Sequence, residues 1–245
     1  MTGQSWSVSI LTGNNFKKDN AGIMISFSRA NRQIYSYLAL RRTVGWIGIL
    51  LPFVLMGGSH FLFGEEVPLF DISMYYYSGM RDVFVGAMCA VGLFLLFYRG
   101  YDRWDNLAAD VAGICAFVIA WFPATKTGPQ DWAGQIHFGA AGVFFAVLAL
   151  FSLFLFTRGE KDPTPRKIQR NVIYIVCGTI LLLAALGMFV YFLFLQKQFP
   201  HTRFVFWAET LALVSFGVSW LTKGGSLLPD KTAFVTLQGD NTGIV

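Results

Sequence analysis

Six long apolar runs alternate with short polar segments along the chain, and the runs carry almost no charge. A helix of about 20 residues spans the hydrocarbon core of a bilayer, and backbone polar groups in lipid must bond within their own segment. A β-barrel strand would alternate apolar and polar residues, and the run from Val172 to Leu195 does not. The pattern therefore predicts an all-α, polytopic membrane protein built as a six-transmembrane-helix bundle. The expected spans are Thr43 to Phe63, Arg81 to Tyr98, Leu107 to Phe122, Gly134 to Phe156, Asn171 to Leu195 and Arg203 to Leu221.

Composition supports the same class. Hydrophobic residues make up 55% of the chain and charged residues only 13%, whereas a soluble domain carries about 25% charged residues. No basic tract is interleaved with base-stacking aromatic residues, so we expect no nucleic acid among the partners. The expected partner is the lipid bilayer itself. The sequence does not determine the oligomeric state.

The basic residues predict the orientation of the helices. Only Arg81, Lys126, Lys197 and Arg203 of the 19 lysines and arginines fall on one predicted side, and the others fall on the side that holds both termini. Positive residues stay cytoplasmic. We therefore expect a multi-pass protein of the cell inner (plasma) membrane with both termini cytoplasmic.

Three regions follow from this topology. Residues 1–40 are expected to form a cytoplasmic N-terminal segment, in which apolar residues mixed with Arg29 and Arg32 suggest a helix on the inner leaflet. Residues 41–223 form the six-helix domain, and residues 224–245 a mobile cytoplasmic tail. Within the helices, Gly86 with Ala90 and the small residues from Gly139 to Gly142 are expected to permit close approach of neighbouring helices.

All three histidines fall on the predicted outer side. His60 ends the first span, His137 begins the fourth, and His201 precedes the sixth. Three neutral imidazoles with a water are a common ligand set for catalytic zinc. The chain has no His-x3-His pair to fix two ligands on one helix, so the alternative is that each histidine bonds to neighbouring residues or lipid head groups.

The polar stretch from Ser73 to Asp82 lies on the same side. If a helix begins near Ser78, then Ser78 shares a face with Asp82, and Tyr77 shares one with Arg81. In a functional interpretation, Asp82 is a ligand or base and Arg81 holds an anion. In the alternative, Asp82 stabilises the positive end of the helix while Arg81 extends to lipid phosphates.

Glu209 lies about two turns into the last span. A carboxylate at that depth is costly unless it is paired, protonated or hydrated. Arg81, Arg203 or a histidine are candidate partners. The alternative is a structural link to tyrosine or tryptophan donors on a neighbouring helix.

Three stretches carry a family resemblance: Arg41 to Gly45 leading into Leu51 to Leu55, then Tyr75 to Gly86, then Tyr98 to Asp102. They resemble a group of uncharacterised six-helix prokaryotic membrane proteins assigned to a domain-of-unknown-function family. This resemblance implies a six-helix bundle and no particular activity.

A weaker parallel is with the alkaline ceramidase and adiponectin-receptor membrane hydrolases, which are seven-helix proteins with a zinc held by three histidines and assisted by Ser and Asp. This chain offers matching residue types, although it departs from that group in helix count and lacks the paired histidines. The matching types are Ser59, His60, Asp82, His137 and His201.

Three functions remain open at this point. The first is a lipid-directed, metal-assisted hydrolase acting at the outer face, with Asp82 or Glu209 as base. The second is a channel or transporter for protons, ions or small molecules, with Glu209, Asp82 and Asp110 along its path. The third is a non-catalytic lipid-binding or assembly subunit.

Overall fold

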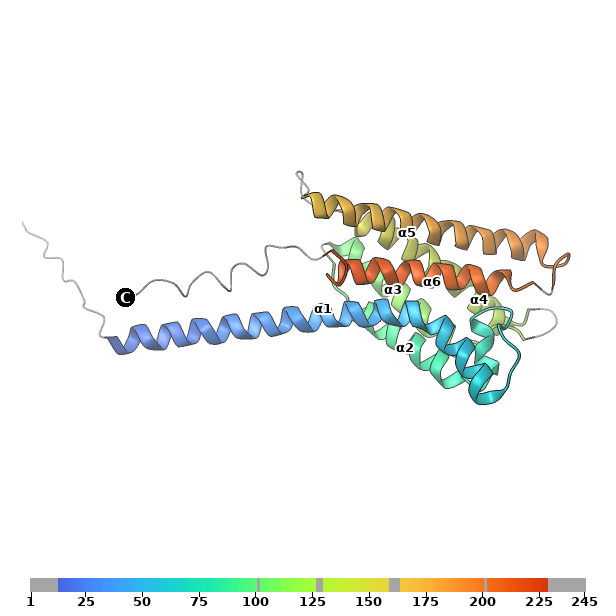
Figure 1. The fold of residues 1–245 in the computed structure, drawn as a ribbon, viewed down its shortest axis with the longest axis horizontal. Coiled ribbons are helices and arrows are strands. Elements are labelled where there is room, and N and C mark those ends of the chain that lie inside the picture. The colour runs from blue at the N-terminus through green and yellow to red at the C-terminus, as the bar shows by residue number, and fades with distance from the viewer. Residues whose placement is uncertain (1–12, 101, 127–129, 159–163, 201, 229–245) are drawn as a thin grey trace, which may run out of the picture. The chain divides into compact units, whose positions relative to one another are not determined.

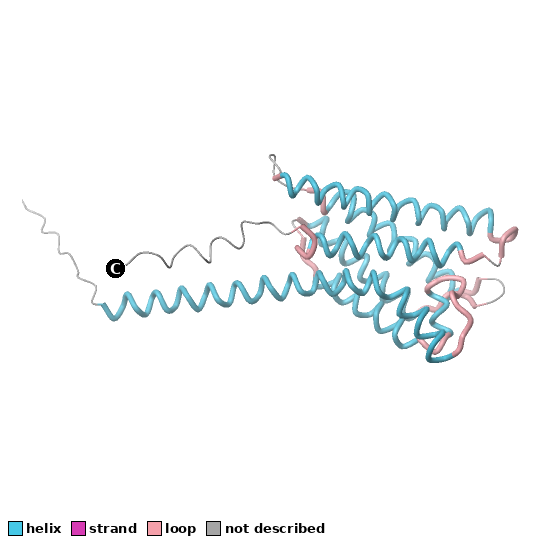
Figure 2. The backbone as a smooth tube through the Cα atoms, in the orientation of Figure 1, coloured by secondary structure: helices cyan, strands magenta, loops and turns pink. Residues whose placement is uncertain are grey.

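The computed structural model describes the backbone of residues 13–100, 102–126, 130–158, 164–200 and 202–228, and side chains from Leu38 onward. Within these ranges the chain is helix and loop, without a strand (Figures 1 and 2). The all-α prediction is confirmed for this part of the chain. The helices are α1 (Gly13–Phe63), α2 (Arg81–Phe97), α3 (Arg103–Trp121), α4 (Trp132–Leu150), α5 (Pro165–Val190) and α6 (Phe204–Lys223).

Short helical turns complete the elements. A 3-10 turn, η1 (Ser73–Tyr77), precedes α2, and π-helical turns η2 (Phe151–Leu155) and η3 (Tyr191–Leu195) extend α4 and α5. The chain divides into two compact units, residues 1–39 and residues 40–245.

Five helices are long and apolar enough to cross a membrane: Leu38–Phe63, Arg103–Trp121, Trp132–Leu155, Pro165–Leu195 and Phe204–Lys223. These helices indicate an integral, multi-pass membrane protein. The remaining helix, α2, has 17 residues. At 1.5 Å per residue it is about 25 Å long, somewhat shorter than a hydrocarbon core of about 30 Å. A sixth span therefore stays a prediction.

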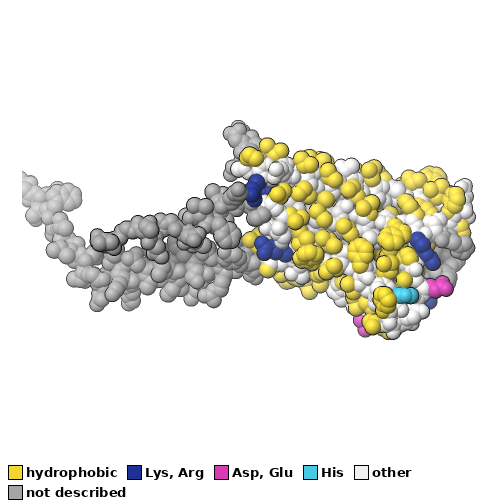
Figure 3. All heavy atoms as spheres, in the orientation of Figure 1, with side chains coloured by type: hydrophobic (Ala, Val, Ile, Leu, Met, Phe, Trp, Pro, Cys, Tyr) yellow, Lys and Arg dark blue, Asp and Glu magenta, His cyan; other side chains and the backbone are white. Residues whose placement is uncertain are grey.

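The helices differ in how much protein surrounds them. Of the most apolar stretch of α6, 61% is buried, against 28% to 39% for the other four spans. The surface between the two ends of the bundle is largely hydrophobic (Figure 3), and it exposes Ile114, Leu183 and Phe194. An apolar surface of this extent fits contact with lipid acyl chains.

Glycines allow two helix pairs to meet at backbone distance. A Cβ added to Gly45 of α1 would lie 2.9 Å from the carbonyl oxygen of Gly217 in α6, and one added to Gly113 of α3 would lie 2.9 Å from that of Gly92 in α2. The glycines that were expected from the sequence at close helix contacts do not lie against another helix. Gly86, Gly139 and Gly142 have nothing within 4 Å of an added Cβ, so the expectation was wrong for these three glycines.

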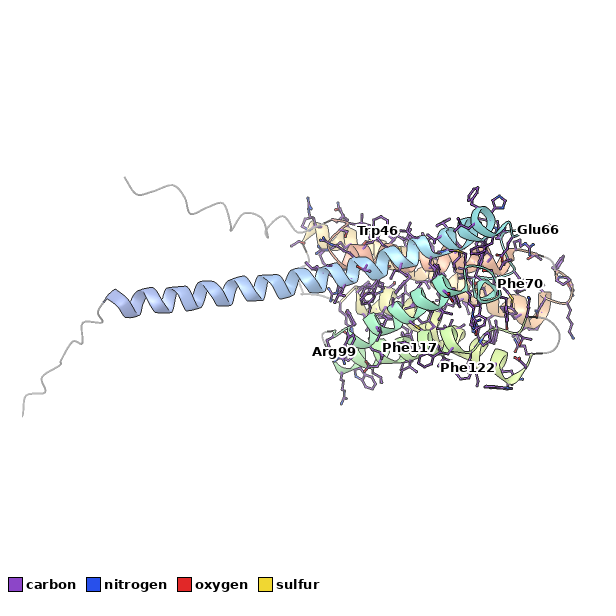
Figure 4. All side chains as sticks on the ribbon, turned by 90° about the horizontal axis from the view of Figure 1, so that it is seen from below. Trp46, Glu66, Phe70, Arg99, Phe117 and Phe122 are labelled. Atoms are coloured by element: carbon purple, nitrogen blue, oxygen red, sulfur yellow. The ribbon has the colours of Figure 1, made fainter. Side chains whose placement is uncertain are left out.

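The bundle has two chemically different ends. The end that carries the segment 64–80 between α1 and α2 is called the loop end, and Figure 4 labels Glu66 and Phe70 there. The opposite end, where α2 finishes near the labelled Arg99, is called the basic end. Because consecutive helices run in opposite directions, every connection lies at one end or the other.

Candidate functional site

The segment 64–80 is attached to the first turns of α6 by two backbone groups. The amide of Phe206 donates to the carbonyl oxygen of Phe70 at 3.1 Å. The amide of Ile72 donates to Oε2 of Glu209 at 2.6 Å. The sequence had placed Glu209 near a basic or histidine partner, and its hydrogen bond in the structure comes from a main-chain amide.

Asp71 is the residue that sequence reasoning missed. Its side chain is only 7% exposed, and Oδ1 accepts the amide of Met74 at 2.7 Å. Burial raises the pKa of Asp71 to about 6, against the smaller opposing effect of hydrogen bonds from the Met74 and Ser73 amides. Asp71 is also close enough for its charge to act on Glu209, so the two acids form a pair.

A signal for Asp71 exists in the sequence. Aspartate often precedes a helical turn and accepts the amide three residues later, as Asp71 does from Met74. That signal predicts a local turn. It does not show that the turn folds against Glu209, 138 positions further along the chain. Only the structure shows that Asp71 and Glu209 are neighbours.

His137 joins the same segment from α4. Its Nδ1 lies 2.7 Å from the carbonyl oxygen of Phe122, and its Nε2 lies 2.9 Å from Oγ of Ser73. A carbonyl can only accept, so Nδ1 carries the proton. In the neutral ring, Nε2 then accepts the hydroxyl proton of Ser73. Both His137 and Ser73 are buried.

Asp71, Ser73, His137 and Glu209 are called the carboxyl–imidazole cluster below. One stretch of three residues, 71–73, touches α6 through Ile72 and α4 through Ser73. Tyr75 follows the cluster residue Ser73 in η1. It is fully buried, and the centre of its ring lies 6.2 Å from that of Phe206. Burial raises the pKa of Tyr75, so this phenol stays neutral.

Tyr77 and Ser78, two of the predicted site residues, bond to main-chain atoms. The Tyr77 hydroxyl donates to the carbonyl oxygen of Ala124 at 2.9 Å. The Ser78 hydroxyl donates to the carbonyl oxygen of Tyr75 at 2.8 Å and accepts the amide of Met80 at 3.0 Å. These contacts attach the segment to the α3–α4 connection and shape the turn that leads into α2.

Arg81 and Asp82 lie on the exposed first turn of α2. The Arg81 guanidinium donates to the Tyr76 hydroxyl at 2.6 Å and lies 4.2 Å from the centre of the Tyr76 ring. Arg81 is thus paired with an aromatic side chain, and Glu209 is held elsewhere. Asp82 is an acid of the first helical turn, where a negative charge stabilises the helix.

The three histidines have different surroundings. His60 is exposed at the end of α1, edge-on to Phe61 with 4.9 Å between ring centres. His137 has both ring nitrogens engaged, and His201 lies outside the described residues. In the part of the chain that is described, no group of three His, Cys, Asp or Glu side chains is placed to hold a metal ion. The zinc site stays a prediction that involves His201.

The cluster offers two kinds of chemistry. Two neighbouring carboxyls, one buried and one partly buried, can hold and release a proton. A serine hydroxyl on a neutral imidazole, with the other ring nitrogen fixed by a carbonyl, is an arrangement that activates nucleophiles.

No family model matches this chain, and neither a curated protein nor a solved structure matches it.

Proposed function

We propose that this is a multi-pass membrane protein of the transporter class that binds a proton at Asp71 and Glu209. One observation carries the proposal: two carboxyls from distant parts of the chain meet at the loop end, where the amide of Ile72 bonds to Glu209 and the amide of Met74 to Asp71. Glu209 lies within the candidate span Phe204–Lys223, and acids at that depth are rare and mark proton or ion pathways.

Charge repulsion and burial both favour a bound proton on this pair of acids. Two neighbouring carboxylates in a poorly hydrated environment repel each other, and burial disfavours both charges. One of the two acids therefore holds a proton at a pH where an exposed acid would have lost it. The raised pKa of Asp71, about 6, lies in the range through which the pH outside a cell varies. Glu209 keeps partial exposure, which gives protons access to the pair.

The topology belongs to the same proposal. With α2 as a sixth span and both termini cytoplasmic in a plasma membrane, the loop end faces outward. Residues 1–40 and 224–245 are then the cytoplasmic segments. The resemblance to six-helix prokaryotic membrane proteins fits this arrangement and adds no activity to it.

Proton flux into liposomes tests the proposal. Purified protein is reconstituted with a pH-sensitive dye inside, and a potassium diffusion potential drives protons inward. We expect uptake by the wild type, loss of most of it in Glu209→Gln and in Asp71→Asn, and full uptake in Asp82→Asn, which removes an exposed acid of the same end. Flux that is absent in the wild type, or equal in all four proteins, contradicts a proton pathway.

A separate measurement isolates proton binding from transport. Infrared difference spectra between pH 5 and pH 8 should show a protonated carboxyl band in the wild type that Asp71→Asn or Glu209→Gln removes. If that band is present while the liposomes show no flux, the acid pair binds a proton without transporting it. If the band is unchanged in both variants, the pair is not the proton-binding site.

A lipid-directed hydrolase is the second candidate, favoured by the 2.9 Å contact between Ser73 Oγ and His137 Nε2. Ser73 would be the nucleophile, His137 the base, and Phe122 the group that orients the ring. Two features weigh against it. The Ser73 side chain is buried, and the amides of Ser73 and Met74 bond to Asp71, where a hydrolase would use such amides to stabilise an oxyanion.

Labelling with a fluorophosphonate probe separates the two candidates. A hydrolase should be labelled in detergent and in liposomes, and Ser73→Ala should abolish the labelling while Ser78→Ala preserves it. Absence of labelling in the wild type, with intact helical content, would remove the serine hydrolase. A non-catalytic subunit, the third hypothesis, predicts neither flux nor labelling.

A further inference from the structure

The basic end contains a buried indole without a hydrogen-bond partner. Trp220 of α6 is 2% exposed, and its Nε1 has no partner among the described residues. Its ring lies edge-on to Tyr98, at 5.2 Å between ring centres, and to Phe156, at 5.5 Å. A buried N–H without an acceptor is destabilising, so this position favours a ligand that supplies an acceptor oxygen.

Cations lie against the rings that surround Trp220. The Arg41 guanidinium is 5.3 Å from the centre of the Tyr98 ring, and the Lys223 ammonium is 5.3 Å from that of Phe156. The Lys167 ammonium is 5.8 Å from the Tyr174 ring, which itself contacts Phe156. Three positive charges from α1, α5 and α6 therefore gather around one aromatic group.

These charges are close enough to influence one another. Arg41, Lys167 and Arg170 lie close enough to act on the charge of Lys223, and so does the acid Asp105. Asp105 also forms an ion pair with Arg158, at 3.3 Å. Four basic side chains, Arg41, Lys167, Arg170 and Lys223, are thus neighbours at this end of the bundle.

Asn171 of α5 adds a second unsatisfied atom. Its Oδ1 is buried and has no partner among the described residues, and Asn171 lies one helical turn after Lys167, on the same face. Phosphate oxygens accept hydrogen bonds, and the hydroxyls of a glycerol head group donate them. A ligand with both groups would suit the Trp220 N–H and the Asn171 oxygen.

We infer that the basic end binds the phosphate of an anionic glycerophospholipid, with Arg41, Lys167 and Lys223 as its cationic contacts. A lipid is favoured over a soluble phosphate because large apolar side chains are exposed next to Arg41 in α1 and in the first two turns of α5, where acyl chains would pack. These are Leu40, Ile168 and Val172. Basic sites between membrane helices bind anionic head groups in this way. The inference does not depend on proton binding at the loop end.

Native mass spectrometry from mixed micelles tests it, with phosphatidylglycerol and phosphatidylcholine as probes. A lysine or arginine near a membrane surface contributes about 1 kcal/mol to anionic lipid binding, which is about fivefold in affinity. We expect Lys223→Gln and Arg41→Gln each to weaken retention of phosphatidylglycerol about fivefold. The exposed Lys197→Gln at the loop end is the matched control and should change nothing. Equal retention of both lipids by the wild type would overturn the inference.

The indole provides a readout that does not rely on affinity. In ¹⁵N-tryptophan NMR spectra, assigned with Trp220→Phe, the Trp220 N–H signal should shift on adding phosphatidylglycerol and stay unchanged with phosphatidylcholine. Glycerol phosphate, which lacks acyl chains, should leave it unchanged at the same concentration. A shift of equal size with glycerol phosphate would assign the site to a soluble phosphate instead, and no shift with any probe would remove the site.

Discussion

The buried carboxyl of Asp71 should make the stability of this protein fall as the pH rises. Its pKa is about 6 in the folded chain against 3.8 for an exposed aspartate. Between these values the folded state binds more protons than the unfolded state, so the free energy of unfolding declines with increasing pH. The stabilisation is complete below pH 4 and is lost as the pH rises through about 6. At about 1.4 kcal/mol per pKa unit, the difference amounts to about 3 kcal/mol.

Asp71→Asn is the perturbation that isolates this effect. The asparagine carbonyl can still accept the amide of Met74, so η1 should keep its turn. The apparent Tm of the detergent-solubilised protein is followed by tryptophan fluorescence from pH 4.5 to pH 7.5. A change of 3 kcal/mol corresponds to about 6–12 °C for a chain of this size. We expect the wild type to lose several degrees across this range and Asp71→Asn to lose much less.

Asp82→Asn is the control, because Asp82 is exposed at the same end of the bundle. It should retain the wild-type dependence on pH. An Asp71→Asn protein whose Tm declines as steeply as that of the wild type would refute the reasoning. So would a wild type whose Tm is flat over the range.

Three further comparisons test the hydrogen bonds at the site and the packing of the helices. His137→Ala should lower the free energy of unfolding by about 3 kcal/mol, because it leaves the Ser73 hydroxyl and the Phe122 carbonyl without their buried partner. Ser73→Ala should lower it less, and thermal unfolding ranks the two variants. Gly217→Leu should lower the free energy of unfolding by at least about 2 kcal/mol, because the added side chain meets the α1 backbone at Gly45. Gly142→Leu is the control. It should be nearly neutral in the same assay, because an added Cβ there has open space. Tyr77→Phe removes one exposed hydrogen bond to Ala124 and should cost about 1 kcal/mol, seen as a small loss of Tm.

Periodicity and apolar length predicted the helices well, because lipid imposes a requirement that each segment meets locally. The run beginning near Asn171 has a matching helix in α5, and the last run matches α6. The weaker case is α2, whose 17 residues are apolar but short. Length alone therefore does not decide whether it crosses the bilayer.

The site was predicted in part. Glu209 and His137 were recognised because a polar side chain inside an apolar run is conspicuous in the sequence. Asp71 was missed, and Ser73 was noted only as the start of a polar stretch, because both lie in a connecting segment, where polar residues are ordinary. Their importance comes from the docking of residues 71–73 between α4 and α6, and that is a tertiary contact which no local pattern encodes.

The glycines illustrate the same limit. Gly86, Gly139 and Gly142 were expected at helix contacts, yet the close approaches occur at Gly45 with Gly217 and at Gly92 with Gly113. A small residue satisfies a helix interface and a lipid-facing surface equally well. Only the rotation of each helix about its axis decides between them, and composition does not specify that rotation.

The hydrogen bond from the Ile72 amide to Glu209 bears on how mutagenesis of this protein should be interpreted. Every residue except proline supplies the same donor, so an alanine scan across the segment leaves that bond in place and reports position 72 as a simple apolar side chain. A backbone change is needed to expose its contribution, such as an amide-to-ester replacement at Ile72. Tolerance of substitutions there would thus conceal the contact on which the acid depends.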